Sequence, residues 1–148
     1  MELQQKTKTD TNGLIAPYGG ELKNLIIKDK NLKIDLISKA TYEFECSERN
    51  ACDVELLMVG AFSPLEGFMD ENNYKSVIKN NRDTNGLLFG LPIVFDSNNE
   101  KVKAGETILL TYKKQKIAVL EVSSKWEPDK SLEAELCYGT NSLDHPAV

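Results

Sequence analysis

The stretch SERNACDVELLMVGAFSPLEGFM, residues 47–69, holds a helix start, a helix body, a helix stop and a fixed turn in one run. Ser47 is a good N-cap because its hydroxyl can accept a hydrogen bond from a free backbone N–H of the first turn. Gly60 stands where the left-handed backbone of a helix C-cap is most easily adopted. The pair Ser63-Pro64 then favours an extended or turn geometry. The stretch therefore predicts a helix that ends in a tight corner.

The apolar side chains of this stretch predict which of its parts are buried. Cys52, Leu56 and Val59 fall at i, i+4 and i+7, so they share one face of the helix. We expect Leu57 and Met58 to widen that face until the helix is fully packed. The segment that follows the helix is too apolar to be a flexible tether, so we expect a buried corner there. Its large apolar side chains are Phe62, Leu65, Phe68 and Met69.

The composition is that of a single globular domain. The chain has 148 residues, enough for one stable core, and its 41% hydrophobic and 28% charged residues are ordinary values for a globular protein. A net charge of −5 does not favour a surface that follows nucleic-acid phosphates. No apolar run approaches the roughly 20 residues needed to cross a bilayer. The polar N-terminus lacks the apolar centre of a signal peptide, so we expect a cytoplasmic protein.

The first part of the chain carries weaker patterns. Residues 1–12 show no periodicity and predict a flexible tail, which leaves residues 13–148 as one domain. The adjacent Gly19 and Gly20 mark a tight turn or a close backbone approach. A phosphate-binding loop is the alternative for these glycines, although the Lys-Ser/Thr of a Walker loop is absent. Alternation of apolar and acidic residues over 42–46 predicts a half-buried strand that leads into the helix.

After the corner, the pattern changes from helical to extended. Asp70 is expected to cap a second helix that ends near Asn80 and Asn81. The sequence Asp-Thr-Asn-Gly at 83–86 predicts a turn. Alternating apolar residues over 91–95 follow, and Pro92 among them limits ladder hydrogen bonds. We therefore expect an edge or irregular strand there.

The last third predicts a hairpin and a short helix. Two apolar runs, 107–112 and 117–122, are separated by a polar tip at 113–116. Such near-continuous apolar strands are typical of a small barrel buried on at least one side. In the last helix, Leu132 and Leu136 lie four residues apart and are expected to face inward.

The sequence offers few candidates for catalysis. His145 is the single histidine, and its neighbour Asp144 would point away from it on an extended chain, so we expect a loop role for it. Arg49 and Arg82 are the only arginines; either could hold an anion, and a surface ion pair is the favoured role for each. The lysines of the tip at 113–116 lack an aromatic platform, apart from the preceding tyrosine, on which bases could stack.

The cysteines and carboxylates also favour structural roles. The three cysteines, Cys46, Cys52 and Cys137, are expected to be reduced and to serve packing, because zinc would need closer pairs and more ligands. A reactive thiol is the alternative, and it would need an exposed, electropositive setting. Asp53 and Glu55 are expected on a solvated or salt-bridged edge of the central helix.

Four motifs, in order along the chain, carry a resemblance to a known family. They are APYGG-L at 16–22, CD-ELLM-G-FSPLEGFM at 52–69, LPIVFD at 91–96 and EAE-CYGT…DHPAV at 133–148. Together they resemble the N-terminal region of ATP sulfurylase, also called sulfate adenylyltransferase. The resemblance covers nearly all of the chain beyond the first dozen residues, and the 52–69 motif is the most specific part of it. Val59 and Ala61 depart from the Asn-Gly-Gly that usually precedes Phe-Ser-Pro-Leu in that family.

The resemblance implies an α+β fold: a PUA-like, β-barrel-like domain with flanking helices. It also implies the reaction of ATP and sulfate to adenosine 5′-phosphosulfate and pyrophosphate, the first step of sulfate assimilation. The catalytic QxRNP and HxxH segments of that family are absent here, so we assign this chain no catalytic, cofactor-binding or metal-binding residue. We expect a fragment or isolated domain that is inactive alone, while its parent enzyme uses ATP as the magnesium complex.

The resemblance also sets the expected partners. They are the catalytic domain of the same enzyme through an interdomain contact, sulfate and ATP as substrates of the parent, and further copies in a homo-oligomer. No nucleic acid and no membrane is expected among them. The alternatives are a PUA-like RNA-binding module and a stand-alone interaction domain without enzymatic activity.

Overall fold

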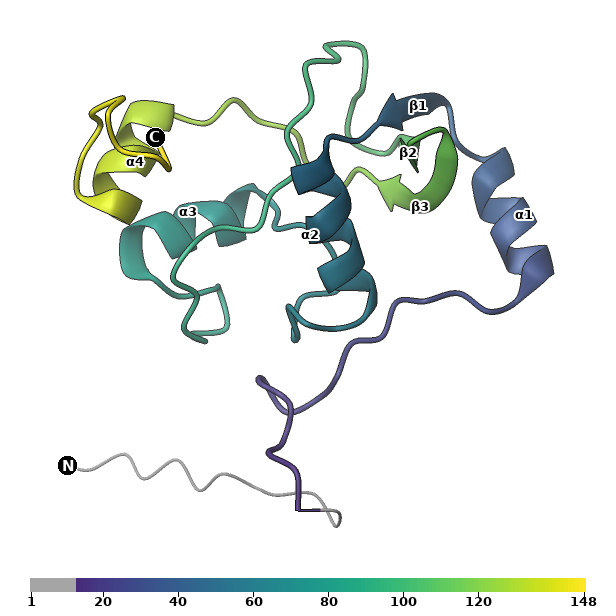
Figure 1. Cartoon of the computed structure of the whole chain (residues 1–148), viewed down its shortest axis with the longest axis horizontal. Coiled ribbons are helices and arrows are strands. Elements are labelled where there is room, and N and C mark those ends of the chain that lie inside the picture. The colour runs from purple at the N-terminus through teal and green to yellow at the C-terminus, as the bar shows by residue number, and fades with distance from the viewer. Residues whose placement is uncertain (1–12) are drawn as a thin grey trace.

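A computed structural model describes residues 13–148 of the chain (Figure 1). The predicted tail at 1–12 lies outside these residues. The described part consists of a small mixed sheet with helices around it, which is the expected α+β arrangement. In chain order the elements are α1 Lys30–Ser38, β1 Tyr42–Glu45, α2 Glu48–Met58, α3 Glu71–Asn80, β2 Thr107–Tyr112, β3 Gln115–Glu121 and α4 Lys130–Tyr138.

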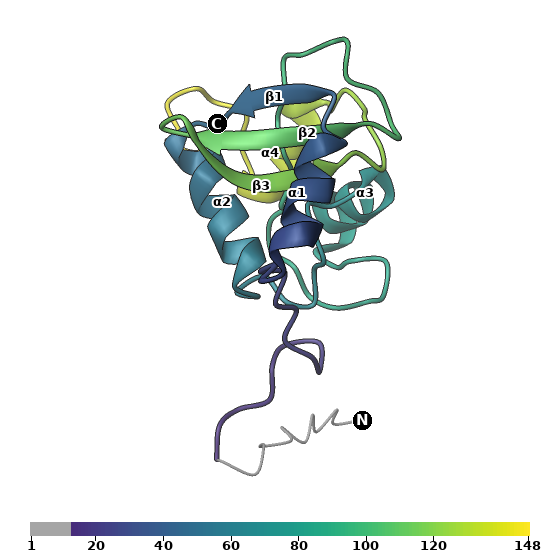
Figure 2. The ribbon, with the colours of Figure 1, turned by 90° about the vertical axis from the view of Figure 1, so that its right-hand side faces the viewer.

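The sheet has the order β1-β2-β3, and β2 is its central strand (Figure 2). β1 pairs with β2 in parallel, with Tyr42 opposite Ile108, and β2 pairs with β3 antiparallel, with Ile108 opposite Leu120. Successive residues of a strand point to opposite faces, yet both Leu109 and Leu110 are buried. Both faces of β2 are therefore covered, which explains why its sequence is a continuous apolar run instead of an alternating one.

The β2–β3 hairpin confirms the predicted strand pair but has a shorter tip. Tyr112 pairs directly with Gln115, so the loop consists of Lys113 and Lys114 alone. Both lysines have positive φ, at 49° and 63°. Two left-handed residues are what a two-residue loop needs to follow the twist of the strands. The predicted tip at 113–116 is thus too long by two residues, because polarity alone cannot separate a loop from the exposed start of a strand.

The helices begin where their capping residues predict. The Ser47 hydroxyl accepts a hydrogen bond from the Asn50 amide at 3.2 Å, and the Asn50 side chain accepts one in return from the Ser47 amide at 3.3 Å. Asp70 accepts from the Asn73 amide at 2.8 Å and so caps α3, which ends at Asn80 as expected. Each cap provides an acceptor for a first-turn N–H that has no partner within its helix.

The predicted inner face of α2 is wrong. Cys52, Leu56 and Val59 are exposed, whereas Val54 and Leu57 are buried. The helix has apolar residues on more than one side, so a single i, i+4 pair does not decide which side packs. The packed side follows instead from the sheet, because Val54 joins the core formed around β2.

The inner face of α4 is also different from the prediction. Leu132 and Leu136 are exposed, while Ala134 is buried. Glu133, on the inward side, accepts a hydrogen bond from the buried Tyr74 hydroxyl at 2.7 Å. This charge-assisted bond to α3 turns the helix so that a carboxylate faces the protein and two leucines face solvent.

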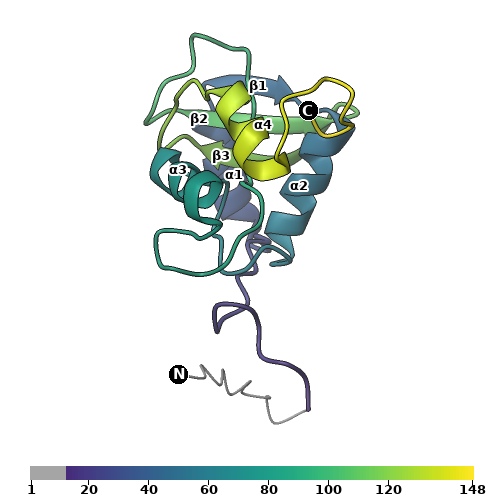
Figure 3. The ribbon, with the colours of Figure 1, turned by 90° about the vertical axis from the view of Figure 1, so that its left-hand side faces the viewer.

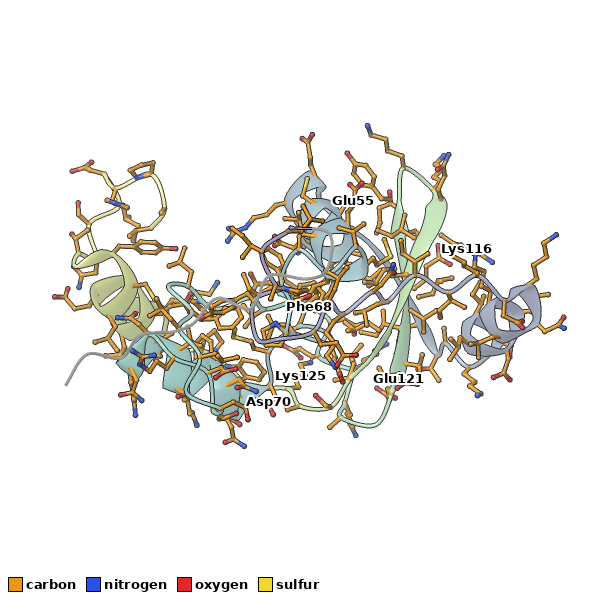
Figure 4. The ribbon with its side chains drawn as sticks, turned by 90° about the horizontal axis from the view of Figure 1, so that it is seen from below. Glu55, Phe68, Asp70, Lys116, Glu121 and Lys125 are labelled. Carbon is orange, nitrogen blue, oxygen red and sulfur yellow. The ribbon has the colours of Figure 1, made fainter. Side chains whose placement is uncertain are left out.

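No strand forms over 91–95, contrary to the prediction. Within the described residues this segment keeps one backbone bond to the corner, from the Met69 amide to the Ile93 carbonyl at 2.8 Å. Pro92 cannot donate to a ladder, which accounts for the loss of regular pairing. The side chains still pack: the Phe95 ring lies 5.0 Å from that of Phe44 and 5.3 Å from that of Phe68, which is labelled near the middle of the molecule in Figure 4.

The segment 13–27 runs without helix or strand along the C-terminal end of α2 (Figures 2 and 3), and we call it the strap. Hydrogen bonds to the rest of the protein hold it. The Leu25 amide donates to the Met58 carbonyl at 2.9 Å, the Lys23 amide to the Ser63 hydroxyl at 2.9 Å, and the Tyr18 hydroxyl to the Leu88 carbonyl at 2.9 Å. The strap is thus fastened at the corner that follows α2.

Candidate functional site

The corner after α2 is less buried than predicted: Met69 is buried, whereas Phe62, Leu65 and Phe68 are half-buried. The corner is built around Ser63. The Ser63 hydroxyl donates to the Gly60 carbonyl at 2.6 Å and accepts from the Lys23 amide at 2.9 Å. Gly60 has φ of +82°, and the Ser63-Pro64 peptide is cis. Ala61, which stands where the resembling family has glycine, is not among the residues with positive φ, so its side chain is tolerated without backbone strain. One hydroxyl therefore joins the helix end, the corner and the strap.

The two adjacent glycines of the strap form the expected tight turn. The Gly20 amide donates to the Pro17 carbonyl at 2.9 Å, and Gly19 has φ of +76°. A Cβ placed on Gly19 would lie 2.7 Å from the Pro64 Cγ atom. The positive φ and the close approach of the Pro64 ring are thus the physical reasons for glycine here.

A cleft of about 370 Å³ opens beside the corner. Lys23 and Glu66 form an ion pair across it at 2.8 Å. This pairing lowers the pKa of Glu66 and, together with Glu21, raises the pKa of Lys23. Glu66 is exposed and Lys23 is only partly buried, so the contribution of this ion pair to stability is small. The cleft is lined by Lys23, Pro64, Leu65, Glu66, Asn73, Asp83 and Asn85.

The buried Asp83 in this cleft organises the predicted 83–86 turn. Its carboxylate accepts from the Asn85 amide at 2.9 Å and from the Leu87 amide at 2.8 Å. Asn73 of α3 fixes the same turn by accepting from the Thr84 amide at 3.0 Å. The sequence predicts the turn but not the meeting of its residues with α3, because that contact joins distant segments. The polar groups of the cleft are engaged in holding the loop, which is not the arrangement of an acid–base pair.

The other residues considered for chemistry are spread over the molecule. Arg82 donates to the Gly86 carbonyl at 2.9 Å, and in the described part of the chain neither Arg82 nor Arg49 forms the expected ion pair. The His145 ring stacks on Tyr138 at 5.4 Å, and its Nδ1 accepts from the Ala147 amide at 3.2 Å, which fits the expected loop role. Of the two carboxylates on α2, Glu55 is exposed and Asp53 half-buried.

All three cysteines are unpaired, as expected. Burial raises the pKa of the Cys46 and Cys137 thiols, which favours their protonated form. Cys52 is exposed, so the packing role predicted for it is wrong.

Metal-binding and membrane-spanning features are absent from residues 13–148. These residues bring together no group of three or more histidine, cysteine, aspartate or glutamate side chains that could hold a metal ion. None of their helices is long and apolar enough to cross a membrane.

At the hairpin tip, the Lys113 ammonium lies 5.0 Å from the centre of the Tyr112 ring. The lysine therefore covers the one aromatic ring at the tip on which a base could stack.

A family model described as a PUA-like domain matches residues 15–148. This chain belongs to the PUA-like domain family. The match begins inside the strap, so the strap is part of the domain despite its lack of regular structure. The predicted fold class is confirmed, with the sheet and helices described above.

Curated relatives are similar to this chain over most of its length. The sulfate adenylyltransferase of Neurospora crassa is 40% identical over 89% of this chain, which corresponds to 24% of that protein. The sulfate adenylyltransferase of Schizosaccharomyces pombe is 41% identical over 86% of this chain and 28% of its own length. The chain therefore spans about a quarter of the length of these relatives.

A solved structure also has a similar fold. The hexameric APS kinase from Thiobacillus denitrificans matches with a TM-score of 0.70 and 29% identity, over 79% of this chain and 24% of that one. The predicted resemblance is thus confirmed in sequence by the curated relatives and in fold by the PUA-like match.

Proposed function

We propose that this chain is the N-terminal PUA-like domain of a sulfate adenylyltransferase, the enzyme that converts ATP and sulfate into adenosine 5′-phosphosulfate and pyrophosphate. The observation that carries the proposal is the 40% identity to the Neurospora crassa sulfate adenylyltransferase over 89% of this chain. The parent enzyme would act in the cytoplasm, in the first step of sulfate assimilation.

The role of the chain within that enzyme is to support the catalytic domain. In the corner cleft, Asp83 holds a turn and Lys23 is paired with Glu66, and the described residues offer no cluster of metal ligands. They therefore do not fit a magnesium site. We place ATP, its magnesium and sulfate on the remainder of the parent and assign them no ligand in residues 13–148.

The parent is proposed to be a homo-oligomer. The support is the solved neighbour, which is described as hexameric and shares 29% identity with this chain. We do not extend the proposal to RNA binding, because the net charge is −5 and the basic hairpin tip carries a single tyrosine beside its lysines.

The experiment compares this chain with the full-length parent in an assay of pyrophosphate release. The parent should release pyrophosphate from ATP in a sulfate-dependent manner, and this chain alone should not exceed buffer. The matched control supplies ATP without sulfate, which separates the reaction from ATP hydrolysis. A parent without sulfate-dependent release, or turnover by the chain alone, would overturn the proposal.

A further inference from the structure

An asparagine–glycine step, Asn85-Gly86, lies in the turn that Asp83 organises. The sequence holds a second such step, Asn12-Gly13, of which the structure describes only the glycine. Asparagine is one of the chemically labile residues of proteins, and a following glycine has no side chain to shield the backbone nitrogen between them. The step is therefore a candidate for spontaneous loss of ammonia.

Both reacting groups of this step are accessible to solvent. Asn85 and Gly86 are exposed, and nothing lies within 4 Å of a Cβ placed on Gly86. Among the described residues, the side-chain amide of Asn85 has no hydrogen-bond partner, because the bond that Asn85 makes to Asp83 comes from its main chain. The side-chain oxygen of Asn73 in the same cleft, by contrast, accepts from the Thr84 amide at 3.0 Å. The Asn85 side chain is thus free to turn towards the backbone.

The reaction at this step needs water as its only co-reactant. The Gly86 backbone nitrogen gives up its proton and forms a bond to the side-chain carbonyl carbon of Asn85, while the bond from that carbon to Nδ2 breaks. Nδ2 takes up a proton and leaves as ammonia, so a cyclic imide joins the two residues. Water then opens the imide at either carbonyl carbon, which gives aspartate or isoaspartate, the form in which the main chain runs through the former side-chain carbon.

The turn opposes this reaction by holding the attacking nitrogen. The Gly86 amide donates to the Asp83 carbonyl at 3.0 Å, and the Arg82 guanidinium donates to the Gly86 carbonyl at 2.9 Å. The buried Asp83 carboxylate accepts from the amides on either side, that of Asn85 at 2.9 Å and that of Leu87 at 2.8 Å. We call the three bonds to Asp83 the Asp83 clamp. Attack requires the clamp to open at Gly86, and the flanking bonds make that opening rare.

We propose that Asn85 is a site of spontaneous deamidation and that the Asp83 clamp sets its rate. The inference does not depend on the proposed function, because every group it uses belongs to this chain. Aspartate at position 85 adds a negative charge to a cleft that already holds Asp83 and Glu66. Isoaspartate lengthens the main chain between two amides that share one Asp83 oxygen, so both bonds cannot be kept. Deamidation therefore opens the turn.

The first test incubates the chain in neutral buffer and follows each asparagine by peptide mass mapping, with an isoaspartate methyltransferase to label isoaspartate. Among the asparagines of residues 13–148, Asn85 should convert fastest and should give both products. Asn85→Gln should abolish conversion at this position and leave the other peptides unchanged. No conversion of Asn85, faster conversion of another asparagine in this range, or a product without isoaspartate would overturn the proposal.

The second test opens the clamp by substitution. Asp83→Ala should speed conversion of Asn85 by about tenfold or more, because it removes two hydrogen bonds to a charged acceptor. Arg82→Ala, at an exposed position, should speed it by about threefold and keep the native circular dichroism. The matched control is Arg49→Ala, at the other exposed arginine, which should leave the rate unchanged. Equal rates in the Arg82 and Arg49 variants would refute the clamp even if Asp83→Ala failed to fold.

The third test removes the clamp without a substitution. In urea, Asn85 should convert as fast as Asn12, since both are then asparagine–glycine steps of an unfolded chain. In native buffer Asn85 should convert about tenfold more slowly than it does in urea, because the clamp must first open. Equal rates for Asn85 in the two solvents would overturn the role of the clamp.

Discussion

Substitution of Gly60 by alanine tests how the strap is held against the end of α2. Gly60 has φ of +82°, where an L-residue costs about 1–2 kcal/mol relative to glycine. An added Cβ would also lie 2.8 Å from Leu22 Cδ1 and 2.9 Å from the Lys23 carbonyl oxygen. The leucine can move, but the carbonyl belongs to a segment fixed by the bonds of Lys23 and Leu25 to the corner.

The steric part of this change should add about 1–3 kcal/mol, the usual cost of overpacking. We therefore expect Gly60→Ala to lower the free energy of unfolding by about 2–5 kcal/mol. For a domain of this size that corresponds to a fall of about 5–15 °C in melting temperature. Urea unfolding followed by far-ultraviolet circular dichroism measures the free energy, and the fluorescence of the single tryptophan, Trp126, gives a second probe.

Gly105 provides the matched control. Its φ is +90°, similar to that of Gly60, but nothing lies within 4 Å of an added Cβ. Gly105→Ala should therefore lose only the backbone part, about 1–2 kcal/mol. Equal destabilisation by the two substitutions would refute the packing of the strap against Gly60. Adding Leu22→Ala to Gly60→Ala should recover only part of the loss, because the contact with the Lys23 carbonyl remains.

Two further predictions concern Tyr74 and the hairpin tip. Burial, together with the bond to Glu133, raises the pKa of Tyr74, so the folded state keeps a proton that the unfolded state loses above about pH 10. The free energy of unfolding should therefore fall as the pH rises beyond about 10, and it should fall less steeply in Tyr74→Phe. Urea midpoints measured across about pH 8–11 would show this difference. An identical slope in both proteins would contradict this. Lys114 has φ of 63°, a left-handed backbone that strains a lysine but not a glycine. Lys114→Gly should therefore raise the free energy of unfolding by about 1 kcal/mol. An unchanged or lower urea midpoint would contradict this backbone strain.

Local signals in the sequence predict most of the fold. The N-caps Ser47 and Asp70 are found as expected, because a short polar side chain satisfies first-turn N–H groups whatever the helix packs on. The alternation over 42–46 yields β1, and the apolar run of 107–112 yields β2. The 52–69 motif, together with three others, leads to the family that the comparisons support.

The errors about helix faces lie where distant segments decide the outcome. The face of α2 is set by Val54 packing into the core around β2, and the face of α4 by the bond between Tyr74 and Glu133. Neither contact is encoded in helical spacing, since both partners are remote in the sequence. The corner cleft is likewise invisible beforehand, because the strap, the corner and the 83–86 turn meet only after folding.

The corner that begins at Gly60 is best explained by positioning and not by chemistry. Its Ser63 hydroxyl has both a donor and an acceptor partner in the protein, with distances of 2.6 Å and 2.9 Å, so it is not an activated nucleophile beside a general base. Asp83 in the adjoining cleft spends its carboxylate on two backbone amides of its own turn. Such groups fix the relative places of helix, strap and loop. A surface held this rigidly can orient a neighbouring domain. The sequence of residues 52–69 is then explained by the helix end and tight corner that these residues must form.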